Sequence, residues 1–289
     1  MNNFNVINPE TTENLLQVMA ENQGKKFRFG AGYTDLILEI KAAPDEELTV
    51  INLARLDDAQ FTSIEKSDEG TTLGALVTAG TLVSDPDLRC QFPVLWRAAE
   101  ELASRQIREV ATVGGNLCTA SPAGDLSAAL VALQARCEIL SAAGGVRVVP
   151  LSDFLLGVRK IDLGEDEVLR SIQVPAQPRH DRTYSDFVKV GTRRSMEIAV
   201  VSLAYHILVD AKDTVTHAGI AIGSVAPTIR FVTSACEFLI GKKFSAIGSS
   251  ESETFAAKVL EYAEPISDMR ASAWYRKEVL YNICRGSFE

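Results

Sequence analysis

The sequence has few cysteines and no cysteine motif. Its five cysteines lie far apart and form no Cys-x-x-Cys pair, which argues against a zinc site or an iron–sulfur cluster in this chain. Their odd number indicates reduced thiols that pack as small core residues. The three histidines, His180, His206 and His217, form no His-Glu-x-x-His pattern and are expected to be structural. The sequence therefore predicts no metal site of its own.

Basic charge and long apolar runs are also scarce. With 38 acidic residues against 29 lysines and arginines, the net charge is -9, and no nucleic-acid partner is expected. No apolar run approaches the roughly 20 residues that cross a bilayer, and the amino-terminal residues do not resemble a signal peptide. We therefore expect a cytoplasmic protein without membrane insertion. An anionic ligand would have to be held by backbone N–H groups or by one or two placed cations.

The length and the pattern of the chain predict two compact units. At 289 residues the chain exceeds a typical single domain, and a polar, proline-containing stretch at 176–184 is the expected boundary. In the first unit, helices are expected at 13–22, 93–103 and 125–135, strands at 25–30, 48–53 and 167–175, and hairpin turns at 67–70 and 142–145. The second unit is expected to hold three strands within 184–225 and three helices within 233–286, an α+β arrangement.

Two glycine-containing segments are the candidate binding elements, Phe29–Leu36 and Thr112–Asp125. Glycine permits a positive φ and lets a ligand approach the backbone, and successive N–H groups then form a concavity that binds anions. Neither segment has the Gly-x-Gly-x-x-Gly pattern of a dinucleotide site or the pattern of a P-loop. Ordinary turns remain the alternative interpretation, more so for the first segment. The second also gathers an asparagine and three hydroxyl side chains.

With these segments, the chain resembles the FAD-binding medium subunit of the molybdenum hydroxylases, the xanthine dehydrogenase and carbon monoxide dehydrogenase family. The resemblance extends over essentially the whole chain. It is carried by four motifs in order: GAGYTDL from Gly30, TVGGN from Thr112, KVGTRR from Lys189 and RASAWYR from Arg270. The second motif is the most specific, because it continues as a run of small residues that ends in Asp125.

The resemblance implies a fold and a cofactor. The fold is α+β, with a two-part FAD-binding domain of the vanillyl-alcohol-oxidase/PCMH type at 1–177, divided into subdomains at about 1–55 and 56–177. A small antiparallel sheet with three helices follows at 180–289, of the CO dehydrogenase flavoprotein type. The resemblance places the FAD diphosphate between the two segments. It implies the following cofactor-binding residues: Phe29, Gly30, Ala31, Gly32, Tyr33, Thr34, Asp35, Thr112, Gly114, Gly115, Asn116, Cys118, Thr119, Ser121, Asp125 and Lys189.

Lys189 is the residue for which the resemblance implies a role in tuning the flavin. A cation near the flavin ring would stabilise the negative charge of the reduced cofactor, because a poorly solvated pocket strengthens Coulomb attraction. The alternative is a solvated lysine at a strand end. Arg193 and Arg194 fall in a loop that covers or opens the acceptor side of the flavin in relatives, or are surface charges paired with Glu197. Cys118 falls near the flavin ring, where a packing role is favoured over a redox role.

Two residues depart from the family pattern. Tyr33 replaces the second glycine of the usual Ala-Gly-Gly, and a positive φ at this position would cost about 1–3 kcal/mol. Glu197 stands where an aspartate is common, which puts the geometry of the loop from Arg193 in question. Neither change removes the backbone expected to bind phosphate.

The function implied by the resemblance is electron transfer. A partner molybdenum-cofactor subunit would hydroxylate the substrate, a purine or another N-heterocycle, and an iron–sulfur subunit with [2Fe-2S] clusters would relay electrons to FAD. The reduced FAD would pass them to NAD+ or another acceptor, in a dimer of heterotrimers. This division explains why the chain shows no catalytic acid or base of its own. Two alternatives stay open, a free-standing FAD-dependent reductase and a scaffold subunit without flavin.

Overall fold

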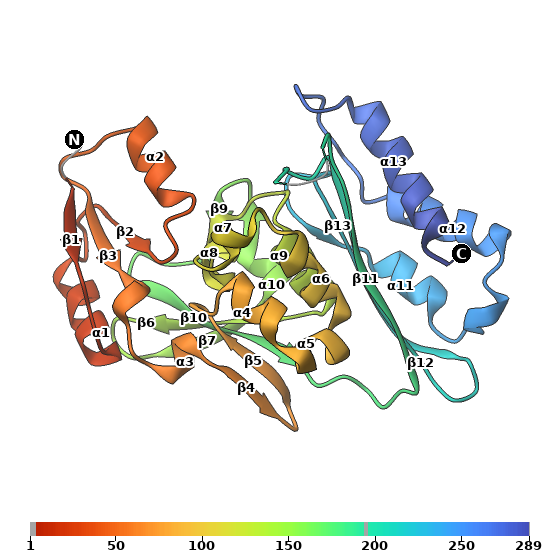
Figure 1. Cartoon of the computed structure of the whole chain (residues 1–289), viewed down its shortest axis with the longest axis horizontal. Coiled ribbons are helices and arrows are strands. Elements are labelled where there is room, and N and C mark those ends of the chain that lie inside the picture. The colour runs from red at the N-terminus through yellow and green to blue at the C-terminus, as the bar shows by residue number, and fades with distance from the viewer. Residues whose placement is uncertain (1–3, 194–195, 289) are drawn as a thin grey trace.

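The computed structural model describes residues 4–193 and 196–288. Three parts follow one another along the long axis of the molecule (Figure 1). A small three-stranded sheet with two helices lies at one end, and a five-stranded sheet covered by helices lies in the middle. A four-stranded sheet with three helices forms the other end. No described helix has the length and apolar character needed to span a bilayer.

The amino-terminal part is a parallel sheet in the order β1-β3-β2, flanked by two helices. Helix α1 begins after Thr11, whose side chain accepts a hydrogen bond from the backbone N–H of Asn14 and caps the first turn. Leu15 and Met19 lie on one face of α1 and are buried against the sheet. The elements are β1 (Asn5–Ile7), α1 (Thr12–Glu21), β2 (Phe27–Gly30), α2 (Leu36–Ala42) and β3 (Thr49–Asn52).

The middle part is an antiparallel sheet in the order β4-β5-β10-β6-β7. Its strands are β4 (Ile64–Ser67), β5 (Gly70–Gly74), β6 (Arg136–Ser141), β7 (Val146–Pro150) and β10 (Glu167–Pro175), and a small hairpin adds β8 (Leu155–Gly157) and β9 (Lys160–Ile161). Its helical segments are η1 (Leu53–Arg55), α3 (Ala59–Thr62), α4 (Ala79–Ser84), α5 (Pro86–Gln91), α6 (Pro93–Glu101), α7 (Arg105–Arg108), α8 (Val113–Thr119), α9 (Asp125–Ala132) and α10 (Leu151–Phe154). All eight residues of α9 are buried, so this helix lies at the centre of the molecule.

The carboxy-terminal part is an antiparallel sheet in the order β11-β12-β13-β14 with three helices on one face. Its strands are β11 (Arg182–Val190), β12 (Val201–Val209), β13 (Val215–Gly223) and β14 (Arg230–Phe231). Its helical segments are α11 (Thr233–Leu239), η2 (Phe244–Ala246), α12 (Ser249–Leu260), α13 (Ala273–Arg285) and η3 (Gly286–Phe288). The other face of the sheet packs against α6 and α9 of the middle part.

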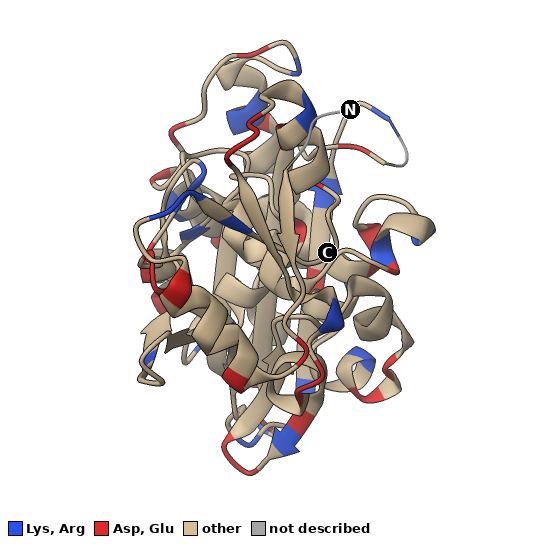
Figure 2. Cartoon of the chain, turned by 90° about the vertical axis from the view of Figure 1, so that its left-hand side faces the viewer, with Lys and Arg blue, Asp and Glu red and all other residues tan. Residues whose placement is uncertain are grey.

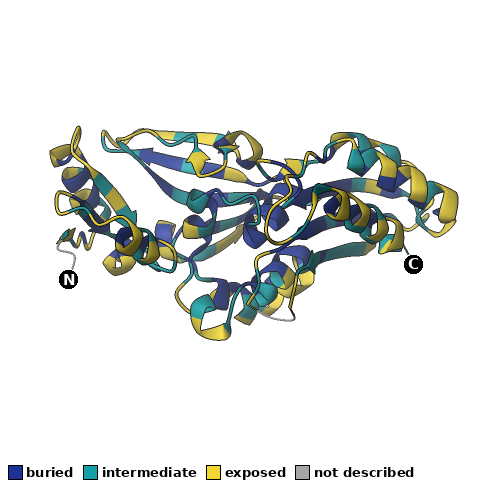
Figure 3. Ribbon diagram, turned by 90° about the horizontal axis from the view of Figure 1, so that it is seen from above, coloured by how far each residue is buried: buried dark blue, intermediate teal, exposed yellow. Residues whose placement is uncertain are grey.

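The middle and carboxy-terminal parts share one core. Phe187, Ala204 and Ala221 belong to the sheet of the carboxy-terminal part, yet they pack in the same buried cluster as α6 and α9. Buried residues run continuously through this junction (Figure 3). Strand β12 is therefore buried on both faces, and most of its residues are apolar. The shared core fixes the position of β11, and with it Lys189, relative to α9.

The structure confirms the α+β class, the hairpin turns and the sheet followed by three helices. Two expectations need correction. The sequence predicted three strands in the second unit, and the short strand β14 is a fourth. The segment from Thr112 to Asp125 was expected to be a loop whose backbone N–H groups form an anion-binding concavity, but its first half is helix α8. Thr112 caps this helix by accepting a hydrogen bond from the N–H of Gly115, 3.0 Å away.

Candidate functional site

The two glycine segments lie against each other, as the resemblance implied. A Cβ atom added at Gly32 would lie only 1.9 Å from the carbonyl oxygen of Val110, two residues before α8 is capped. A hydrogen bond of 3.0 Å from Thr119 Oγ1 to Asp35 Oδ2 joins the bend after β2 to the end of α8. Residues about 80 positions apart in the sequence thus form one site, and only glycine at position 32 permits this approach.

The bend between β2 and α2 has the backbone geometry of an anion nest. Tyr33 has a left-handed φ of 58°, whereas Asp35 has right-handed angles of -100° and -46°. Among the described residues, the N–H groups of residues 32–35 have no hydrogen-bond acceptor. Buried or ligand-facing N–H groups of this kind bind phosphate oxygens without needing a basic side chain. Acidic and basic residues are interspersed over this end of the molecule, without a broad surface of basic residues alone (Figure 2).

Tyr33, which replaces the second glycine of the family motif, has a positive φ. Its ring packs on Gly30, where an added Cβ would lie 2.5 Å from the ring, and it joins the small apolar cluster of α2. Burial raises the pKa of the Tyr33 hydroxyl. This packing offsets a backbone strain of about 1–3 kcal/mol for a non-glycine residue in this region.

The second segment differs from the expected turn of free amides. The N–H of Gly114 donates to the carbonyl of Ala75 at 2.8 Å, and the N–H of Asn116 donates to that of Thr112 at 3.0 Å. These amides are engaged in capping and packing α8, so they are not free to bind a phosphate. Gly114 also packs closely on Ala75, where an added Cβ would lie 2.8 Å from the alanine Cβ. This segment therefore reaches a ligand through side chains and through the exposed Gly115.

Asn116 and Ser121 have local hydrogen bonds within the second segment. Asn116 Oδ1 accepts from both the backbone N–H and the hydroxyl of Ser127, each at 3.2 Å, and so holds α8 to the first turn of α9. Ser121 Oγ accepts from the N–H of Ala123 at 3.2 Å. Cys118 is half-buried against the central core, and burial raises its pKa to about 12. Its thiol is therefore protonated near neutral pH, in agreement with a packing role.

Lys189 and Asp125 form a buried ion pair. Lys189 Nζ lies 2.6 Å from Asp125 Oδ2, and the two side chains are only 5% and 8% exposed. The same ammonium donates to the carbonyl oxygen of Glu101 at 3.2 Å. The alternative of a solvated lysine at a strand end is wrong. The resemblance selected both residues separately, and the structure joins β11 to the start of α9 through them.

Asp125 keeps one oxygen without a partner. Its Oδ1 is buried and accepts no hydrogen bond from the described residues. Burial raises the pKa of this carboxyl to about 6, against the opposite effect of Lys189. An unpaired buried acceptor costs free energy, which a ligand donor at this position would recover. Asp125 Oδ1 is thus an unpaired hydrogen-bond acceptor next to the Lys189 ammonium, which is a donor.

These groups fit a flavin nucleotide. FAD has a diphosphate, which suits the free amides of residues 32–35, and a flavin ring whose edge carries carbonyl acceptors and an N–H donor. The Lys189 ammonium complements the carbonyl acceptors of that edge chemically. Phe29 and Gly30 end β2 directly before the bend, and half-buried Thr34 lies within it, so their positions suit the same ligand.

A pocket of about 650 Å³ adjoins the ion pair. It lies between the end of α6 and the loop after β11, and its charged lining residues are Arg97, Glu100, Glu101, Arg108, Lys189, Arg193 and Glu197. The carboxylate of Glu197 accepts a hydrogen bond from the N–H of Arg193 at 2.5 Å and packs on Gly191. Arg194 lies outside the described residues, so its expected role over the flavin is not addressed by the structure.

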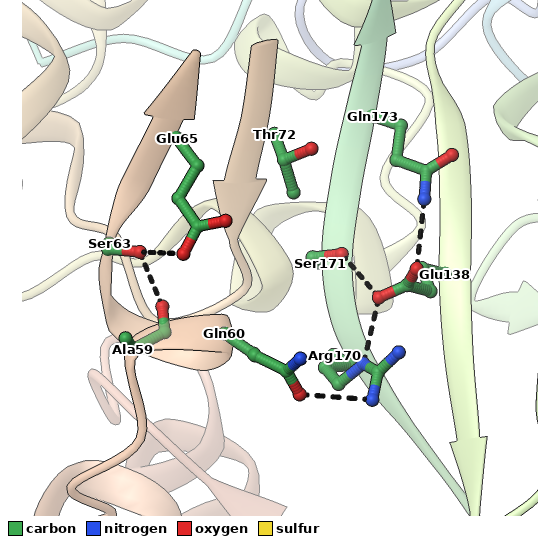
Figure 4. Close-up of a pocket in the computed structure, with 9 residues that line it drawn as sticks. All are labelled: Ala59, Gln60, Ser63, Glu65, Thr72, Glu138, Arg170, Ser171 and Gln173. Atoms are coloured by element: carbon green, nitrogen blue, oxygen red, sulfur yellow. Dashed lines mark hydrogen bonds and ion pairs between the residues drawn. The ribbon is translucent and has the colours of Figure 1, made fainter. Parts of the chain in front are cut away.

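A smaller pocket of about 160 Å³ lies on the middle sheet (Figure 4). The Glu138 carboxylate there accepts hydrogen bonds from Arg170 Nε at 2.8 Å and from Ser171 and Gln173 at 2.9 Å. Arg170 also donates to Gln60 at 3.1 Å. These polar groups already satisfy one another, so they do not mark a binding site.

Glu101 and Val110 were not predicted from the sequence as site residues. Glu101 contributes its carbonyl to Lys189, 88 positions away, and Val110 contributes the carbonyl that approaches Gly32. Both act through backbone atoms, which every residue has. No residue type at these positions signals the contact, because it depends on how distant elements pack.

Two family models and several known proteins match this chain. Residues 2–177 match a family model described as the FAD binding domain in molybdopterin dehydrogenase, and residues 186–288 match the CO dehydrogenase flavoprotein C-terminal domain. The nicotinate dehydrogenase FAD-subunit of Eubacterium barkeri is 28% identical over 294 residues, covering 100% of this chain and 96% of that protein. The xanthine dehydrogenase FAD-binding subunit of Escherichia coli O157:H7 is 28% identical over 278 residues, covering 95% and 91%. The structure of carbon monoxide dehydrogenase from Hydrogenophaga pseudoflava has a TM-score of 0.88 at 25% identity, covering 98% and 95%.

Proposed function

The chain belongs to the FAD-binding subunits of the molybdenum hydroxylase family, and from that premise we propose that it relays electrons through FAD bound at the described site. The electrons would come from a [2Fe-2S] subunit and would leave to NAD+ or another acceptor. The single observation that supports this proposal is the contact between the bend at Gly32–Asp35 and the segment that contains α8. It brings free backbone amides together with the segment that leads to the Asp125–Lys189 pair.

The residues of this chain would bind and position the cofactor. Bound FAD supplies the reversible transfer of electrons. The free amides of residues 32–35 would hold the diphosphate, and Asn116, Thr119 and Ser121 would add short polar groups around it. Gly115 would allow the ligand close to α8. Lys189 would favour negative charge on the ring, because its ammonium lies in a poorly solvated site.

The proposal extends to the assembly. A large subunit with the molybdenum cofactor would oxidise the substrate, a purine or another N-heterocycle, and the heterotrimers would pair into a dimer in the cytoplasm. The names of relatives such as nicotinate dehydrogenase and xanthine dehydrogenase support this class of substrate. We also propose domain limits at 1–177 and 180–289, with subdomains divided near residue 55.

Three measurements test the proposed function. The purified chain is expected to show a flavin absorption spectrum and about one FAD per chain after extraction. Co-expression with the genes next to its own is expected to yield a complex with one molybdenum subunit and one iron–sulfur subunit. A chain that carries no flavin would favour the scaffold alternative, and a flavin-containing chain that captures no such subunits would favour the free-standing reductase. Stopped-flow oxidation of the reduced complex by NAD+ would test the acceptor.

Replacing Asn116 with aspartate is expected to weaken FAD binding several-fold or more. The carboxylate can still accept both hydrogen bonds from Ser127, so α8 and α9 should keep their positions. What changes is a negative charge placed in the segment proposed to face the FAD phosphates. The Kd is measured by fluorescence titration of the flavin-free protein. Unchanged binding would remove Asn116 from the proposed site, and a Ser152→Asp variant on α10 controls for added charge.

A further inference from the structure

The Lys189–Asp125 pair lies between the pocket and the interior. Lys189 lines the pocket of about 650 Å³, whereas Asp125 lies behind it and is buried. Lys189 connects the two, because it is a lining residue of the pocket and its Nζ lies 2.6 Å from Asp125 Oδ2. The lysine is therefore the side chain through which a proton from the pocket would reach Asp125.

The negative charge of Asp125 reduces the effect of the Lys189 ammonium on a negatively charged cofactor. While Asp125 is ionised, the pair carries no net charge, and its field on a neighbouring group is that of a dipole. A reduced cofactor that gains negative charge in a poorly solvated site needs a net positive charge nearby. Removing the charge of Asp125 would provide it without moving any side chain.

We propose that Asp125 takes up one proton from the pocket, by way of Lys189, when the cofactor bound in this chain is reduced. This inference rests on the proposed function, which supplies the cofactor and the electrons. The Lys189–Asp125 pair would then gain one positive charge, and no side chain would have to move. Asp125 would act as a proton acceptor that compensates charge, and Lys189 as the group that delivers the proton.

The step balances in protons and charge. Two electrons reach the cofactor from the iron–sulfur partner. An Nζ–H bond of Lys189 breaks as an Oδ2–H bond forms on Asp125, and the lysine amine takes a replacement proton from a hydronium ion in the pocket, which leaves as water. Lys189 ends as an ammonium, Asp125 ends neutral, and the pair goes from no net charge to a charge of +1. Reoxidation of the cofactor returns the proton by the same path.

The electrostatic environment of Asp125 favours this exchange. Burial raises its pKa to about 6, so the neutral carboxyl is accessible near physiological pH. The charged groups that act on it are Lys189 of β11, which lowers the pKa, and Glu101 of α6, which raises it. Around Glu101 lie Arg97, Glu100 and Asp186, and burial raises the Glu101 pKa as well. Added negative charge on the cofactor would raise the Asp125 pKa further.

The test is the pH dependence of the flavin reduction potential in the assembled complex. For a two-electron couple, each proton taken up adds about 30 mV per pH unit to the slope. Between about pH 7 and 8 Asp125 starts ionised, so the unaltered protein should show a slope about 30 mV per pH unit steeper than Asp125→Asn. Asp186→Asn, which removes a carboxylate three residues from Lys189, should keep the steeper slope. Equal slopes for the unaltered protein and Asp125→Asn would overturn the proposal.

A second measurement needs no altered residue at the pair. Infrared difference spectra between reduced and oxidised protein should show a carboxylic acid band that appears on reduction and shifts when aspartate is labelled with carbon-13. The band should persist in Asp186→Asn. Absence of a label-sensitive band would overturn the proton uptake while FAD remains bound. A chain that binds no FAD would instead overturn the proposed function together with this inference.

Discussion

A Gly32→Ala protein is expected to lose its FAD almost completely while most of the fold remains. The new Cβ would lie 1.9 Å from the carbonyl oxygen of Val110 and 2.7 Å from its carbonyl carbon. Both are backbone atoms, so no side-chain rotation relieves the contact. The 110–111 backbone is itself held, because Ala111 donates to Ile107 at 2.8 Å and accepts from Ala79 at 2.9 Å. The bend after β2 must therefore move away from α8.

The loss should appear first at the link between the two segments. The hydrogen bond from Thr119 to Asp35 would break, and the free amides of the bend would no longer lie beside α8. The ratio of FAD to protein, read from the absorption spectrum, measures the effect, and circular dichroism checks the fold. Gly157→Ala is the matched control, because its Cβ would meet only Lys160 at 3.8 Å. Full FAD occupancy in Gly32→Ala would show that the close approach is not required.

Local signals in the sequence predicted most of the single elements. The glycine and small polar residues at Ser67–Gly70 and Ala142–Gly145 form the turns of two hairpins, as their types indicate. The apolar stripe of α6 is buried at Leu95, Ala98 and Ala99. These features depend on residues that are close together in the sequence, so the local sequence is enough to predict them.

Features that depend on distant contacts were not predictable from one sequence. Strand β10 inserts between β5 and β6, which pairs residues about 100 positions apart, as Ser171 pairs with Gly74. The segment that forms α8 was predicted as a loop because a glycine pair disfavours a helix. The packing of Gly114 on Ala75 and the cap from Thr112 override that preference.

In the candidate site, too, the residues could be predicted from the sequence but the contacts between them could not. The resemblance selected Asp125 and Lys189 separately, and their pairing over 64 positions emerged only from the shared core. It likewise selected both glycine segments, whereas the local sequence did not distinguish the bend with free amides from the segment whose amides are engaged. Residue identity indicates which groups are available, and packing determines which of them remain free to bind.

Replacing Lys189 with alanine is expected to destabilise the protein and to lower the flavin reduction potential. Removing one partner of a buried ion pair leaves an uncompensated charge, which costs about 3–5 kcal/mol. Without the lysine, the pKa of Asp125 rises further above about 6, since the group that lowers it is gone. The folded protein then binds a proton that the unfolded chain releases, so its stability falls as pH rises above the usual carboxyl range.

The destabilisation of Lys189→Ala should therefore be larger at pH 8 than at pH 5, measured by urea unfolding at both values. Adding Asp125→Asn should recover much of the loss at pH 8, because the double variant leaves no buried charge, and Asn keeps nearly the same volume. Lys160→Ala, at an exposed position, controls for loss of a lysine. If Lys189→Ala is as stable as the unaltered protein at both pH values, the pair is not buried in solution. The position assigned to the flavin ring beside it would then be wrong, since that assignment depends on a poorly solvated ammonium.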